Sequence, residues 1–150
     1  MPTPLRVLAP VAGTVRDLAD VPDAVFGQGI VGPGLAIEPL DGEVCAPLTG
    51  VVVAARPHAL VVRSDGRDVL VHLGVDTVNL DGSGFQLLIR IGELVTAGTA
   101  CLRWDPAAVA RAGLSPLCPV AALQARPGGV RLLVRPGDVV KRGAPVLDWT

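Results

Sequence analysis

The chain has 150 residues, of which half are hydrophobic and 18% are charged, and its formal net charge is −1. This composition predicts a single globular domain, residues 1–150, with a substantial core, and excludes a disordered chain. The chain has no Tyr, two Phe and two Trp, and its basic residues form no stripe, so no nucleic-acid partner is expected.

The apolar stretches are too short and too interrupted to cross a membrane. The longest two, Val51–Val62 and Leu114–Leu123, both contain proline, whereas a spanning helix needs about 20 apolar residues. Proline and glycine also interrupt the N-terminal segment where a signal peptide would have its apolar run. We therefore expect a soluble cytoplasmic protein that is not itself embedded in a membrane. Three widely spaced cysteines, an odd number, are more typical of buried thiols than of a disulfide framework: Cys45, Cys101 and Cys118.

Eighteen Gly and fourteen Pro divide the chain into short segments rich in Val, Leu and Ile. Such segments, bounded by turn residues, predict an all-β antiparallel sandwich or barrel. In chain order the clearest strands are Gly34–Ile37, Gly50–Ala54, Leu60–Arg63, Val69–Leu73, Gln86–Ile91 and Val130–Val134. One or two short helices are expected, the clearest being Arg103–Leu114, where Asp105 is able to cap and Pro106 suits the first turn.

Two pairs of similar segments indicate an internal duplication. Residues 9–15, APVAGTV, reappear as APLTGVV at 46–52, and residues 92–98, GELVTAG, reappear as GDVVKRG at 137–143. The spacing is too irregular for a solenoid, so the sequence predicts a duplicated sandwich motif.

The only two histidines, His58 and His72, flank a predicted hairpin. If Ser64, Asp65 and Gly66 form a three-residue loop, His58 lies directly opposite His72, with Cβ atoms about 5 Å apart. If Asp65 and Gly66 alone form a two-residue turn, the pairing moves by one residue and the histidines point to opposite faces. The hairpin residues leave both registers open.

The residues around His72 resemble an active-site signature. Residues 66–78, GRDVLVHLGVDTV, are similar to the signature of the glucose-type enzyme IIA of the bacterial phosphoenolpyruvate:sugar phosphotransferase system. The similarity continues in order through residues 21–26, 30–34, 46–50 and 114–120, so it extends over almost the whole chain.

The resemblance implies an antiparallel β-sandwich with a duplicated motif that acts as a phosphoryl carrier. In this family a histidine accepts a phosphoryl group from the phosphocarrier HPr and passes it to a cysteine of the IIB unit of a sugar permease. The phosphorylated histidine falls on His72, and a second histidine that binds the phosphoryl oxygens falls on His58. The family therefore favours the register that brings the two together.

Further site residues are also implied only by the resemblance. The backbone carbonyl of Gly74 would accept a hydrogen bond from His72, and Asp23 and Asp76 would lie at the rim. Five apolar residues would form the docking surface, although ordinary packing explains each of them equally well: Val25, Phe26, Ile30, Val31 and Leu70. A monomer suits a protein that docks with two partners in turn.

This chain departs from the family at several positions. Leucines at 60, 70 and 73 stand where members often have Phe, and Arg56 replaces the polar residue usually found two before the second histidine. An arginine there either binds phosphate or alters the choice of partner. No cofactor beyond the covalent phosphohistidine is required, although a regulatory zinc held by His58 and His72 is an option.

Two other functions compete with this hypothesis. In a zinc metallopeptidase-like sandwich His58 and His72 would be ligands, but the chain lacks the H-x-H or H-x-x-x-D spacing that would add a third. In a lipoyl or biotin carrier the modified residue would be Lys141, the only lysine, which lies inside the 137–143 turn rather than at a hairpin tip.

Overall fold

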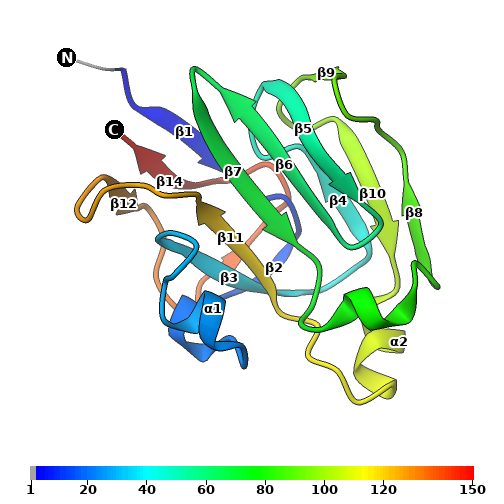
Figure 1. Cartoon of the computed structure of the whole chain (residues 1–150). Coiled ribbons are helices and arrows are strands. Elements are labelled where there is room, and N and C mark those ends of the chain that lie inside the picture. The colour runs from blue at the N-terminus through cyan, green and yellow to red at the C-terminus, as the bar shows by residue number, and fades with distance from the viewer. Residues whose placement is uncertain (1–2) are drawn as a thin grey trace.

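The structure, a computed structural model that describes residues 3–150, is built from fourteen short strands and four short helices (Figure 1). The strands are β1 Leu5–Leu8, β2 Gly13–Arg16, β3 Gly34–Pro39, β4 Glu43–Cys45, β5 Gly50–Arg56, β6 Ala59–Ser64, β7 Arg67–His72, β8 Phe85–Leu87, β9 Leu94–Val95, β10 Ala100–Trp104, β11 Cys118–Ala122, β12 Val130–Leu132, β13 Val139–Val140 and β14 Pro145–Trp149. The short helices are the 3-10 turns η1 Leu18–Asp20 and η2 Thr77–Leu80 and the α-helices α1 Ala24–Gly27 and α2 Pro106–Arg111.

All strand pairs are antiparallel, and they build one large and two small sheets. The eight-stranded sheet has the order β13-β2-β3-β11-β7-β6-β5-β9, and the three-stranded sheets have the orders β1-β14-β12 and β4-β10-β8. Alternation along the strands buries one face of the large sheet: in β7, Val69 and Val71 are fully buried, whereas Leu70 and His72 lie on the opposite, partly open face. The predicted all-β antiparallel sandwich is confirmed.

The duplicated segments occupy equivalent places at the two edges of the large sheet. β9 pairs with β5 at one edge, and β13 pairs with β2 at the other. The hydrogen bonds repeat as well: the N–H of Gly98 donates to Ala46 O at 3.0 Å, and the N–H of Gly143 donates to Ala9 O at 2.8 Å. The sequence repeat therefore corresponds to a structural duplication.

Two predicted elements have different boundaries. The helix predicted from Arg103 begins only at Pro106, because Arg103 belongs to β10 and pairs with Glu43 and Gln86; Asp105 caps it as predicted by accepting from Ala108 N–H. The strand predicted over Gln86–Ile91 ends at Leu87. The α1 helix was not singled out by the sequence, because four residues are too few to show helical periodicity.

The hairpin that links β6 and β7 has the two-residue turn. Ser64 pairs with Arg67 and Ala59 pairs with His72, so Asp65 and Gly66 alone connect the strands. Both have positive φ, 52° and 71°, as a type I′ turn requires. The register that the family resemblance favoured, with His58 directly opposite His72, is therefore wrong.

The three cysteines are free and buried. Burial raises the pKa of the Cys101 thiol to about 11 and that of Cys118 to about 12, so both remain protonated near neutral pH. They act as small core residues.

Candidate functional site

His72 is the last residue of β7, on the partly open face of the large sheet. Its Nδ1 lies 2.7 Å from the carbonyl oxygen of Gly74, the hydrogen bond that the resemblance implied. A carbonyl only accepts, so Nδ1 carries the proton and donates. The lone pair of the neutral ring is then on Nε2, which is the nitrogen available for chemistry.

A tight turn after β7 brings the Gly74 carbonyl to the ring. Gly74 and Asp76 both have left-handed backbones, with φ of 78° and 60°. A Cβ on Gly74 would lie 2.6 Å from Thr77 Cγ2 and 2.9 Å from Ser115 O, so only glycine fits without displacement. The buried Thr77 hydroxyl donates to Leu73 O at 2.6 Å and closes the turn. Thr77 is not among the site residues predicted from the sequence, although it lies inside the signature.

His58 meets His72 despite the two-residue hairpin turn. It lies in the short connection between β5 and β6, before the first residue of β6, and its carbonyl accepts from Leu73 N–H at 2.7 Å. Strand alternation therefore does not fix the direction of its side chain. The two imidazole centroids are 5.2 Å apart with the rings at 69°, so the expectation that this register separates the histidines is wrong.

Both imidazoles are biased toward the neutral form. Burial lowers the pKa of His72 below its ordinary 6.5, against the opposing effects of the Gly74 hydrogen bond and the charges of Asp23 and Asp76. Burial also lowers the pKa of His58, and the neighbouring His72 and Arg56 lower it further. Neutral rings are the state in which a histidine nitrogen is nucleophilic.

The two acidic residues differ in their local roles. The Asp23 carboxylate caps α1 by accepting from Val25 N–H at 2.9 Å, whereas Asp76 is exposed at the start of η2 and makes no side-chain cap. Their charges both act on His72. They provide negative charge on the side of the site formed by α1 and η2.

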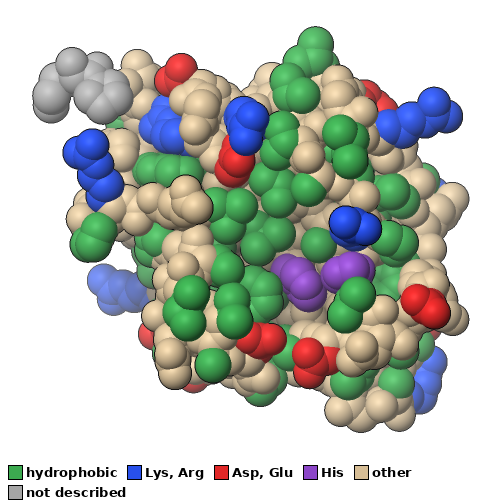
Figure 2. Space-filling view, in the orientation of Figure 1, with side chains coloured by type: hydrophobic (Ala, Val, Ile, Leu, Met, Phe, Trp, Pro, Cys, Tyr) green, Lys and Arg blue, Asp and Glu red, His purple; other side chains and the backbone are tan. Residues whose placement is uncertain are grey.

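The five apolar residues implied by the resemblance divide into two groups. Val25 and Ile30 are exposed, by 43% and 67%, whereas Phe26 is buried with its ring centroid 5.1 Å from that of His72. Val31 and Leu70 are partly buried and pack beside Phe26 in a small cluster. Figure 2 shows the two histidines side by side on one face, with hydrophobic and acidic side chains around them.

Val78 is a further exposed apolar residue, two positions after Asp76 in η2. Val78 is not among the docking residues predicted from the sequence. The feature of the sequence that could have identified it is its place as the last residue of the signature. With Val25 and Ile30, Val78 is a third exposed apolar side chain on the elements that border the histidines.

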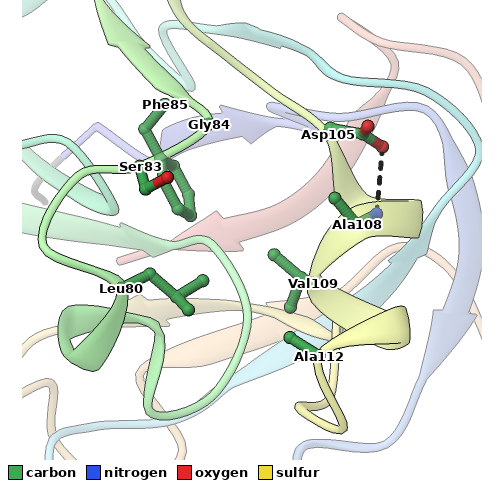
Figure 3. A pocket seen from close by; sticks show the side chains of 8 residues that line it. All are labelled: Leu80, Ser83, Gly84, Phe85, Asp105, Ala108, Val109 and Ala112. Atoms are coloured by element: carbon green, nitrogen blue, oxygen red, sulfur yellow. Dashed lines mark hydrogen bonds between the residues drawn. The ribbon is translucent and has the colours of Figure 1, made fainter.

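A separate hollow lies between α2 and the segment of residues 80–85, which begins at the end of η2 (Figure 3). Its volume is about 180 Å³, and mostly apolar side chains line it, among them Leu80, Phe85 and Val109. The Asp105 carboxylate at its edge is already occupied with capping α2. Neither histidine lines this hollow.

The described part of the chain offers no complete metal site. Within residues 3–150 no group of three or more His, Cys, Asp and Glu side chains is arranged to hold a metal ion. The zinc metallopeptidase alternative therefore gains no third ligand.

The fold and the site together define a duplicated antiparallel sandwich with a neutral histidine pair on one open face. A family profile describing the phosphoenolpyruvate-dependent sugar phosphotransferase system, EIIA 1, matches residues 5–127. The chain belongs to this family.

Individual relatives agree with that assignment. A glucose-specific EIIA component of Oceanobacillus iheyensis is 36% identical over 122 residues, which are 79% of this chain and 74% of the relative. One from Halalkalibacterium halodurans is 38% identical over 117 residues, 76% of this chain and 68% of the relative. The solved structure of glucose permease IIA from Mycoplasma capricolum superposes with a TM-score of 0.88 at 35% identity, covering 98% of this chain and 96% of that one.

Across residues 3–150 no helix has the length and hydropathy required to cross a lipid bilayer. The longest helix, α2, has six residues.

Proposed function

We propose that this chain carries a phosphoryl group on Nε2 of His72, accepts it from HPr and passes it to the cysteine of a IIB sugar-permease unit. The observation that carries the proposal is the hydrogen bond from Nδ1–H of His72 to Gly74 O, which leaves Nε2 unprotonated. Membership of the sugar phosphotransferase family supports the same chemistry.

The transfer balances without an external proton. The Nε2 lone pair forms a bond to phosphorus while the bond from phosphorus to the donor breaks, and the electron pair of that bond remains on the donor. The proton stays on Nδ1 of His72, which donates to Gly74 O throughout, so that carbonyl stabilises the positive charge that develops on the ring. In delivery, the thiolate sulfur of IIB forms the bond to phosphorus while the bond from phosphorus to Nε2 breaks, and its electron pair returns to Nε2.

His58 would bind the phosphoryl oxygens rather than accept the group. Its ring lies at 5.2 Å from that of His72, close enough for both imidazoles to contact one small anion. Phosphoryl transfer passes through a loose transition state, so binding the equatorial oxygens is the main contribution a neighbouring side chain makes.

The partners would dock over the exposed apolar side chains beside the histidines, Val25, Ile30 and Val78, with Asp23 and Asp76 meeting their basic groups. Phe26 would position the His72 ring from below this surface. We propose a monomer acting in the cytoplasm, because the same face must contact two partners in turn.

The carrier would need no cofactor, since the phosphohistidine is itself the intermediate. A regulatory zinc on His58 and His72 would need ligands from a partner, because residues 3–150 supply no third one. Tightly held stoichiometric zinc in the purified protein would contradict the carrier function.

The test is incubation with phosphoenolpyruvate, enzyme I and HPr, followed by mapping of the acid-labile phosphate. The label is expected on His72 and absent from His72→Gln. The His58→Gln variant should accept the group but transfer it slowly to the IIB unit. Label on any other residue would overturn the proposal.

A further inference from the structure

One row of side chains crosses three strands and ends at His72. Arg56 of β5 pairs directly with Ala59 of β6, and Ala59 pairs directly with His72 of β7. Directly paired residues project to the same face of a sheet, so the three side chains lie on the partly open face. With strands about 4.8 Å apart, the Cα atoms of Arg56 and His72 are about 10 Å apart.

The middle of this row is nearly empty. Ala59, the residue between Arg56 and His72 in the row, contributes only a methyl group. His58 lies in the connection between Arg56 and Ala59, and its ring contacts that of His72. The charge of Arg56 acts on His58, the nearer of the two histidines along the chain.

The guanidinium of Arg56 is free to bind a ligand, unlike that of the next arginine on the same face. Arg63 of β6 makes two hydrogen bonds to Asp68, at 2.7 and 3.0 Å. Within the described residues, Arg56 is exposed and has no salt bridge or side-chain hydrogen bond. An arginine fork is well suited to a phosphoryl group, because it presents several N–H donors in one plane.

When His72 carries the phosphoryl group, the site also needs a cation to balance the added negative charge. A phosphoryl group adds about two negative charges. It would lie near Asp23 and Asp76, whose charges already act on His72. The pair of neutral imidazoles does not offset that repulsion.

We propose that Arg56 is a phosphoryl-binding residue of this carrier, reaching over Ala59 to the oxygens of the group held on His72. This inference rests on the proposed function. It assigns to Arg56 the direct role in phosphate binding, rather than recognition of an acidic partner.

The experiment measures phosphoryl exchange with purified phospho-HPr in the absence of any IIB unit, for the wild-type chain and Arg56→Gln. The exchange equilibrium should shift about tenfold toward phospho-HPr, because a charge-assisted contact to the phosphoryl group is lost. Arg56→Lys keeps the charge without the fork and should be intermediate. Arg63→Gln, the same change of charge four residues along β6 from Ala59, should behave as wild type.

A second measurement separates phosphate binding from docking. In phosphorus NMR, removing a nearby cation should raise the pH at which the phosphohistidine takes up its proton in Arg56→Gln but not in Arg63→Gln. An unchanged equilibrium and titration, with only a higher KM for HPr, would assign Arg56 to the partner and overturn the inference. Absence of label on wild-type His72 would instead refute the proposed function itself.

Discussion

Replacing Gly74 with alanine tests whether the turn after β7 creates the nucleophile. The backbone of Gly74 is left-handed, φ 78°, and a Cβ there would lie 2.6 Å from Thr77 Cγ2 and 2.9 Å from Ser115 O. The second contact is to backbone and cannot be relieved by a rotamer change. To accept alanine, the turn must move and carry the carbonyl away from His72 Nδ1.

The expected loss of stability has two parts. A left-handed backbone is unfavourable for alanine by about 1–2 kcal/mol. Overpacking in a close-packed region adds about 1–3 kcal/mol. The sum, about 2–5 kcal/mol, lowers the melting temperature by about 2–4 °C per kcal/mol for a chain of this size.

Gly66→Ala is the matched control. Gly66 has nearly the same φ, 71°, but nothing lies within 4 Å of its added Cβ. It should therefore lose only the backbone part, and the difference in melting temperature between the variants isolates the clash. Nitrogen NMR of the imidazole should show a fixed Nδ1–H tautomer in Gly66→Ala and a mixture in Gly74→Ala, with slower phosphorylation only in the latter. Equal stability losses and equal phosphorylation rates would refute the reasoning.

Four further outcomes are expected. Because folding lowers the pKa of His58 and His72 from 6.5, the unfolded chain binds more protons below that pH. The free energy of unfolding should therefore fall as the pH decreases from about 7 to about 5, and it should fall less steeply in a variant that carries both His58→Gln and His72→Gln. An identical dependence on pH in the two proteins would contradict the lowered pKa of the histidines. Thr77→Val should cost about 1–3 kcal/mol in chemical denaturation by leaving Leu73 O unpaired, whereas Thr14→Val, at an only partly buried position of β2, should not. His58→Gln should reduce delivery to IIB more than uptake from phospho-HPr in single-turnover assays, and equal effects would count against its role. Metal analysis should find substoichiometric zinc, and chelator should leave phosphorylation unchanged.

Much of the fold was accessible from the sequence because its patterns are local. Short runs rich in Val and Leu and bounded by turn residues predicted β6 and β7. The repeated glycine-bounded segments predicted a duplication, and they pair β9 with β5 and β13 with β2. Boundaries were less accessible. Arg103 looked helical next to Pro106, but its pairing with Glu43 and Gln86 is a long-range contact that no local pattern reports.

The site shows where local reasoning fails. Asp65-Gly66 is a strong signal for a two-residue turn, and that signal was right; the error lay in treating His58 as a strand residue. The hydrogen bond to Gly74 O was expected from the resemblance alone, because the composition of the sequence does not predict a left-handed turn two residues after a strand. Burial of Phe26, compared with exposure of Val25 beside it, depends on the direction of one helical turn.

The duplication also explains why the site lies where it does. The strand order of the large sheet places β2-β3 in one half and β5-β6 in the other as equivalent hairpins, but their connections differ. The connection between β5 and β6 is only Pro57 and His58, which delivers His58 to the sheet surface. The connection between β2 and β3 spans residues 17–33 and contains α1, which brings Phe26 against His72 and packs on the outer face of β7. The histidine pair thus forms where the two halves of the repeated fold differ. The segment with α1 covers His72 partly, and the short connection between β5 and β6 leaves the face beside it open. Both are needed to bury the ring of His72 in part while its Nε2 stays accessible.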